Sequence, residues 1–229
     1  MVIINMVFLQ IASDSTSAVS GAHAELPLYE LLLKAGWIMV PIVIALFIAI
    51  YFFFERLITV NKAAKIDRNF MNQVQDLVQD GNIAGARSLC KNSDFPVARM
   101  LDKGLKKIGR PIDDIEKALE SAGKIEVYKL EKNLSILGTI AGVAPMLGFI
   151  GTILGVITIF VHIAAKNTID IGTISEGLYQ KLISSASGLV VGIVAHLGYH
   201  YLLIKIDRQI FKMEATAIEF IDLLQDPAA

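Results

Sequence analysis

This sequence has few charged residues and a single cysteine. Only 19% of its 229 residues are charged, against 54% hydrophobic residues and a mean hydropathy of +0.58, which is too apolar for an ordinary soluble domain. The single cysteine, Cys90, excludes a disulfide framework and a cysteine-rich metal cluster, so we expect a buried thiol there. The net charge of −1 gives no reason to expect a nucleic-acid partner.

Three long runs contain no Asp, Glu, Lys or Arg at all, namely residues 36–54, 133–165 and 182–204. A helix of about 20 residues crosses the hydrocarbon core of a bilayer, so each run is long enough to span it. No strand pattern accompanies them. The sequence therefore predicts an all-α integral membrane protein among membrane lipids, with three transmembrane helices over residues 36–58, 133–165 and 176–204.

Basic residues are distributed unevenly around these spans. Of the 21 Lys and Arg residues, 15 lie between positions 55 and 132, and three follow the last span. Lys and Arg near span ends are retained on the cytoplasmic side of the membrane. We therefore expect a periplasmic N-terminus, a cytoplasmic C-terminus, helical cytoplasmic extensions over residues 59–132 and 205–229, and a short periplasmic loop over 166–175.

Residues 1–35 are expected to form a periplasmic leader and an interfacial helix. The first 12 residues are apolar but lack a basic segment before them, so a cleaved signal peptide is the less favoured interpretation. Residues 25–34 place four apolar side chains on one helical face, which is typical of a helix at the membrane interface: Leu26, Tyr29, Leu32 and Leu33.

Turn-forming residues divide the expected cytoplasmic segment, at Gly81-Asn82, Asn92-Ser93 and Gly109. They predict helices over residues 67–80, 83–91 and 95–108. A further helix opens at Pro111. Only Gly123 interrupts it before Gly138, so this helix can run on into the second span. Its mixed charges are typical of a solvated helix face.

Small residues recur every three or four positions in the second and third spans, at Gly138, Gly142, Pro145, Gly148, Gly155, Gly188 and Gly192. Such stripes let helices approach closely in lipid. Polar side chains accompany the stripes, namely Thr152, Glu176, Gln180, Ser184, Ser185, Ser187, His196, Tyr199 and His200. Because polar groups at membrane depth need protein partners or water, they indicate more than helix packing, although a purely structural scaffold remains an alternative.

The glycine-spaced segments resemble the paired membrane signature of the MotA/TolQ/ExbB proton-channel family, most closely its ExbB branch. The first, GFIGTILG, covers residues 148–155, and the second, GLYQKLISSASGL, covers residues 177–189. The segments 85–90 and 96–105 and the three-span layout are also similar. The resemblance covers nearly everything from residue 26 to the end.

The resemblance implies a stator subunit in the bacterial inner membrane. ExbB-like proteins form a homo-pentamer whose second and third spans line a channel around a single-span, ExbD-like partner. That partner carries the proton on a membrane aspartate, and the complex drives a TonB-like protein that serves outer-membrane transport. Thr152, Ser184 and Ser185 then belong to the channel wall, and no cofactor is implied. A TolQ-like subunit, or a flagellar- or gliding-motor-type stator, is the alternative.

Two positions depart from the family pattern. The family's glutamate in the second motif corresponds to Gln180, which cannot ionise. Glu176 lies one turn earlier on nearly the same face, so it is a candidate carboxylate at the channel mouth, the alternative being an exposed glutamate at a helix start. At the inner end of the third span, the family's Tyr-Asn corresponds to Tyr199-His200.

Two other readings concern the histidines. His196 and His200 are four residues apart and could bind zinc, but two ligands are too few and no Cys, Asp or Glu lies in the neighbouring turns of the span. An intramembrane serine hydrolase would need a Ser–His pair. Ser187 and His196 are about 13 Å apart along one helix, too far for a hydrogen bond within the chain. We therefore expect neither a metal site nor an enzyme.

Overall fold

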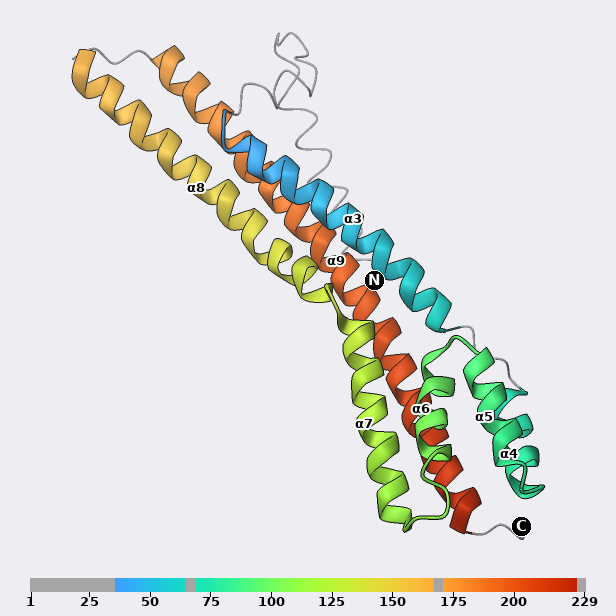
Figure 1. Cartoon of the computed structure of the whole chain (residues 1–229). Helices are drawn as coiled ribbons and strands as arrows, with labels where there is room; N and C mark the ends of the chain where they lie inside the picture. Colours follow the sequence, from blue (N-terminus) through green and yellow to red (C-terminus); the bar gives the residue numbers. More distant parts are fainter. Residues whose placement is uncertain (1–35, 65–68, 167–170, 226–229) are drawn as a thin grey trace, which may run out of the picture.

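The computed structural model describes residues 36–64, 69–166 and 171–225. Within those ranges the chain is all-helical, which confirms the predicted class (Figure 1). Its helices are α3 (Met39–Ala63), α4 (Phe70–Gln79), α5 (Ile83–Asn92), α6 (Pro96–Leu105), α7 (Ile112–Glu131), α8 (Leu134–Lys166) and α9 (Ile171–Gln225). The predicted leader and interfacial helix lie outside the described residues.

Three of these helices are long and apolar enough to cross a membrane. The qualifying stretches are Met39–Ala63, Leu134–Ala165 and Gly177–Gln225, and an 18-residue window within each has a mean hydropathy of 2.2, 2.2 and 1.6, respectively. Many of their large side chains face outward, for example Phe47 and Phe149, which are 67% and 61% exposed. Lipid is the solvent that accepts such a surface, so the chain is a multi-pass membrane protein with the three spans predicted.

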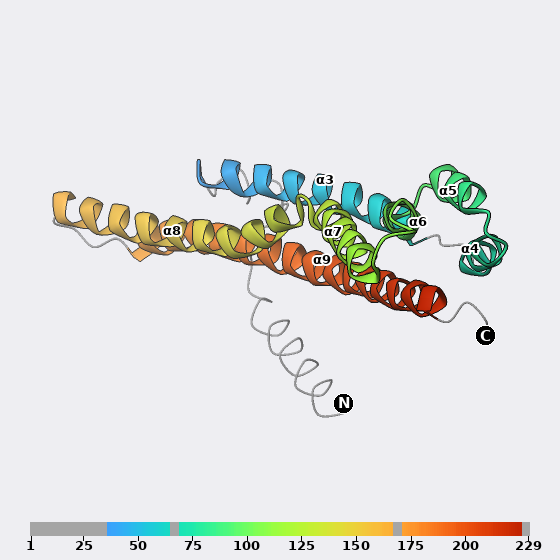
Figure 2. The ribbon, with the colours of Figure 1, turned by 60° about the horizontal axis from the view of Figure 1, so that its bottom comes forward.

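The helix α9 runs through both halves of the elongated molecule (Figures 1 and 2). Its 55 residues extend about 80 Å. The third span and the C-terminal segment are therefore one helix, because no Gly or Pro follows Gly198 within it and apolar positions continue to Phe220. It begins at Ile171, inside the segment predicted to be a loop.

The helices α4 to α7 pack with the C-terminal part of α9 as a separate helical domain. Its core joins side chains from all five helices, among them Phe70, Cys90, Leu101, Leu119 and Phe220. Each of the five is at most 3% exposed. This domain has its own apolar core and does not depend on lipid to cover it.

Backbone conformation decides where the helices of this domain end. Gly81 and Gly109 have φ values of 72° and 93°, which side chains other than glycine rarely adopt. The expected continuation of the helix from Pro111 into the second span is wrong. Asn133 has a φ of 64° and separates α7 from α8, since asparagine tolerates the left-handed region that other residues avoid.

Candidate functional site

Glycines let the backbones of α8 and α9 touch. A Cβ added at Gly188 would lie 2.6 Å from the carbonyl oxygen of Ala144 and 3.0 Å from the Cα of Gly148. A Cβ at Gly148 would in turn lie 3.0 Å from the carbonyl oxygen of Ser184 and the Cα of Ser185. A Cβ does not fit at Gly188 and would be crowded against backbone atoms at Gly148, so this contact, which we call the seam, favours glycine on both helices.

Other predicted packing positions extend the seam in both directions. A Cβ at Gly192 would be 2.5 Å from Cγ of Pro145, and one at Gly138 would be 3.4 Å from the ring of Tyr199. Gly142 differs, because it is exposed and has no atom of the described structure within 4 Å of its Cβ position. The glycine stripe therefore contains seam positions and one position with no neighbour in the described protomer.

The hydroxyl groups near the seam have different surroundings. Ser184 is fully buried against Gly151 and donates to the carbonyl of Lys181 at 2.7 Å. Its predicted place in an open channel wall does not agree with this burial. Thr152 is half-buried and donates to the carbonyl of Phe149 at 2.6 Å. Ser185 is half-buried, and its hydroxyl has no hydrogen-bond partner among the residues that the structure describes.

Thr152 and Ser185 lie on the side of the seam away from α3. The positions that face α3 include Ile140 on α8 and Val191 on α9, which share a cluster with side chains of that helix. At about 100° per residue, Thr152 lies about 120° round α8 from Ile140, and Ser185 about 120° round α9 from Val191. Two hydroxyls, one from each motif, thus share the face of the α8–α9 pair that α3 does not cover.

Lys181 is a residue that the sequence reasoning missed. Its side chain lies across Gly155 of α8, in the space that a Cβ there would need. Its Nζ lies 3.4 Å from the Cβ position of Gly36, just before α3. The signal was present, because Lys181 is the only charged residue of the second motif and Gly155 is the final glycine of the first.

Two other candidates sit in the same part of α9. Gln180 is half-buried, beside Lys181 in sequence. Glu176 belongs to the second turn of α9, which begins at Ile171, so it is not at the helix start. Its side chain lies outside the described structure, and its role at a channel mouth stays a prediction.

The aromatic and histidine side chains farther along α9 contact one another. The rings of His196 and His200 have centroids 4.4 Å apart, and those of Tyr199 and His200 are 5.2 Å apart. Both histidines are exposed in the protomer, whereas Tyr199 packs on Gly138. In the described part of the chain, no three His, Cys, Asp or Glu side chains form a group that could hold a metal ion.

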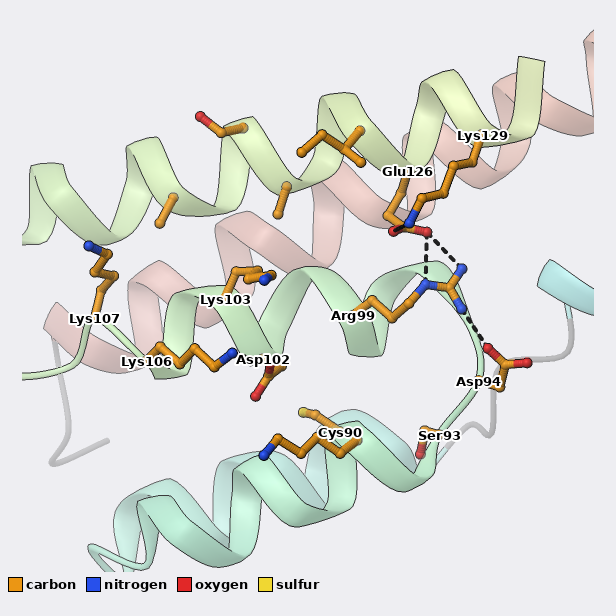
Figure 3. A pocket seen from close by; sticks show the side chains of 15 residues that line it. Cys90, Ser93, Asp94, Arg99, Asp102, Lys103, Lys106, Lys107, Glu126 and Lys129 are labelled. Carbon is orange, nitrogen blue, oxygen red and sulfur yellow. Dashed lines mark hydrogen bonds and ion pairs between the residues drawn. The ribbon is translucent and has the colours of Figure 1, made fainter. Parts of the chain in front are cut away.

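An ion-pair network around a buried carboxylate in the helical domain was not predicted. Glu126 of α7 is 5% exposed and accepts hydrogen bonds from Arg99 at 2.7 Å and Lys129 at 2.6 Å (Figure 3). Burial alone would raise the pKa of Glu126, but the two cations outweigh it and lower the pKa below its usual value. The expected solvated face of α7 therefore contains a buried carboxylate, because α6 supplies Arg99 opposite it.

Comparison with known protein families identifies the family of this chain. The family model of the MotA/TolQ/ExbB proton channel family matches residues 92–215, which is more than half of the chain and includes both motifs. The chain belongs to this family. This match confirms the resemblance drawn from the motifs.

Individual relatives carry ExbB and TolQ names. An ExbB homolog of Methanothermobacter thermautotrophicus is 29% identical over 185 residues, covering 79% of this chain and 65% of that relative. The biopolymer transport protein ExbB of Aquifex aeolicus is 34% identical over a segment that covers 38% of this chain and 59% of that relative. The Tol-Pal system protein TolQ of Pseudomonas aeruginosa is 28% identical over a segment that covers 48% of this chain and 47% of that relative. The chain thus spans less than two thirds of the first of these relatives.

Proposed function

We propose that this chain is the channel-wall subunit of an ExbB-like, proton-driven stator complex in the bacterial inner membrane. The observation that carries the proposal is the pair of hydroxyls, Thr152 and Ser185, on the face of the seam away from α3. Hydroxyls at membrane depth can hydrogen-bond water or a partner's acid without carrying a charge of their own.

The carboxylate of the pathway would come from a second protein. The apolar runs 36–54, 133–165 and 182–204 contain no Asp or Glu, so this chain offers no proton-carrying acid in the middle of a span. A single-span, ExbD-like partner with a membrane aspartate supplies what is missing. In the proposed assembly, five copies of the chain surround that partner and drive a TonB-like protein, as the family resemblance implies.

The proposed orientation follows the distribution of basic residues. The segment between the first two spans, residues 55–132, holds 15 of the 21 Lys and Arg residues, so the helical domain formed by α4 to α7 belongs in the cytoplasm together with the C-terminal part of α9. The ends of α8 and α9 nearest residues 167–170 then face the periplasm. Protons moving inward would pass Thr152 and Ser185 before reaching the level of the histidines.

The relatives named TolQ favour one alternative, in which the same channel serves a Tol-Pal type of system. Hydrolase chemistry has less support. Ser187 donates to the carbonyl of Ile183 at 2.8 Å, and it lies on the same continuous helix as His196, so within one chain it has no histidine base. Identifying the small single-span protein that copurifies with the chain would distinguish the ExbB-like assignment from the TolQ-like one.

The Thr152→Val substitution tests the channel proposal. Valine keeps the shape of threonine but removes its hydroxyl, so proton flux through the complex with its partner in vesicles should fall at least tenfold. Thr158→Val is the matched control. Thr158 is exposed on α8, also bonds a carbonyl of its own helix at 2.8 Å, and lies about 120° round the helix from Thr152. Equal flux in both variants would remove Thr152 from the pathway.

A further inference from the structure

The helical domain contains an open cleft between α5, α6 and α7, with a volume of about 770 Å³ (Figure 3). Six cationic side chains line it, namely Lys91, Arg99, Lys103, Lys106, Lys107 and Lys129. Three carboxylates join them, namely Asp94, Asp102 and Glu126. The formal charge of the lining is therefore +3, in a chain whose net charge is −1.

The three carboxylates are already neutralised by neighbouring cations. Glu126 is held by Arg99 and Lys129, and Asp94 lies 2.7 Å from Arg99. Asp102 lies 3.2 Å from Lys106 and 3.3 Å from Arg87. These carboxylates consequently have little capacity to neutralise further cations in the cleft.

Three lysines of the cleft remain without such a partner. Lys91, Lys103 and Lys107 form no ion pair with a carboxylate in the ranges that the structure describes. Lys103 and Lys107 lie on the α7 side of the cleft, whereas Asp102 and Lys106 lie toward α5 (Figure 3). The α7 wall opposite them consists partly of small residues, Ala118, Ser121 and Ala122, which leave the space open.

We propose that this cleft binds a phosphate group, with Lys91, Lys103 and Lys107 as the cations that hold it. A concave surface with excess positive charge concentrates anions, and lysine binds phosphate as a compact point charge with three donors. Because these three ammonium groups have no carboxylate partner in the described structure, they match a multiply charged anion better than a ligand with a single carboxylate. The inference does not depend on the proposed channel, because it concerns a domain outside the seam.

Two sources could carry the phosphate group, and the structure favours a soluble one. Lys129 precedes Leu130, which packs in the core shared with α3 and α9, so this end of the cleft lies near the spans. Lys106 directly follows α6 and is seven residues beyond Arg99, which places it about 10 Å farther from that end. A lipid headgroup could reach Arg99 and Lys129, whereas Lys103 and Lys107 are placed for an anion from solution.

The first experiment measures binding of inorganic tripolyphosphate to the full chain in detergent by calorimetry. The parent protein should bind it, and added NaCl should weaken binding. The double variant Lys103→Gln/Lys107→Gln should lose at least tenfold in affinity. The control, Lys117→Gln/Lys212→Gln, removes two exposed lysines outside the cleft and should bind like the parent. No binding by the parent, or equal loss in both variants, would overturn the proposal.

The second experiment identifies the source of the phosphate group. The chain is placed in nanodiscs of phosphatidylcholine alone or with phosphatidylglycerol, and tripolyphosphate is titrated into each. Equal affinity in both supports a soluble ligand. A different result would assign the site to a lipid headgroup and overturn the soluble source. In that case tripolyphosphate binding is lost only in nanodiscs that contain phosphatidylglycerol, and the Lys129→Gln substitution restores it. Thermal unfolding of each variant without ligand verifies that it is folded.

Discussion

Arg56 of α3 donates from Nη1 to the main-chain oxygen of Lys129 at 3.0 Å, across 73 positions of sequence. The same nitrogen lies 3.4 Å from the oxygen of Leu130, and Glu55 pairs with the guanidinium at 2.9 Å. Helix C-termini leave carbonyl oxygens without partners, and α7 ends at Glu131. Arg56, itself only 4% exposed, therefore ties the first span to the point where the helical domain joins the second.

We expect Arg56→Gln to lower the free energy of unfolding by about 1.5–3 kcal/mol, because hydrogen bonds to charged groups contribute about that much. The measurement is thermal or denaturant unfolding in a fixed detergent. Arg208→Gln serves as the control, since Arg208 is exposed on α9. A loss no greater than that of the control would mean that solvent replaces the two bonds to α7.

The seam can be tested by filling one glycine position. Gly188→Val should destabilise the chain by about 1–3 kcal/mol, because its Cβ would lie 2.6 Å from the oxygen of Ala144 and force the helices apart. Gly142→Val adds the same side chain where no described atom lies within 4 Å, so unfolding of the protomer should change little. Equal losses would reveal a neighbour of Gly142 that the protomer does not provide.

The ion pairs of the buried Glu126 carboxylate predict a defined pH dependence of stability. Because its folded-state pKa lies below the usual 4.5, the stabilisation is present above about pH 4.5 and is lost as pH falls through the folded-state value. Glu126→Gln should cost about 1–3 kcal/mol at pH 7, since it leaves the donors of Arg99 and Lys129 poorly matched. The difference from the parent should shrink as pH falls through the folded-state value, because the parent's carboxyl becomes protonated there.

Glu120→Gln is the matched control for that experiment. Glu120 is on the same helix and also pairs with a lysine, Lys124 at 2.6 Å, but its side chain is 61% exposed. Exposed pairs of this kind contribute little, so unfolding at pH 7 should be almost unchanged. If the two variants unfold alike at every pH, burial of Glu126 has no energetic consequence.

Cys90 should be unreactive while the chain is folded. It is 1% exposed, and burial, assisted by the nearby charge of Asp102, raises the pKa of its thiol to about 12. The nucleophilic thiolate is then almost absent at pH 8, so labelling by iodoacetamide should require denaturant. Asn92→Cys in a Cys90→Ala background places a thiol at an exposed position two residues away and should label at once. Rapid labelling of the native parent would contradict the burial.

Glu176 and Gln180 lie one turn apart at the outer end of the proposed channel, and substitutions can test which of them belongs to the proton pathway. If Glu176 has taken over the family carboxylate, Glu176→Gln should strongly reduce proton-coupled activity, whereas Gln180→Glu should be tolerated because related proteins place an acid there. Full activity of Glu176→Gln, measured in the same proton-flux assay, would leave Thr152 and Ser185 as the polar groups of the wall.

The sequence by itself determined the fold class, the three spans and the family. Charge-free runs such as 133–165 are long and apolar enough to span a bilayer. Turn-forming glycines such as Gly81 and Gly109 mark helix ends because few other residues adopt their backbone conformation. The paired motifs likewise indicated a seam between the second and third spans. These are local properties, set by hydropathy, spacing and backbone sterics.

Only the tertiary structure decided which side chains meet. Ser184 and Ser185 are adjacent in sequence, yet Ser184 is buried in the seam and Ser185 is half-buried on the side of it away from α3. Glu126 looked like one more charge on a solvated helix, and its burial depends on Arg99, which α6 brings across from 27 positions away. Such pairings depend on how the helices rotate and pack against one another, because the burial and the partners of a side chain are set by residues that are distant in sequence.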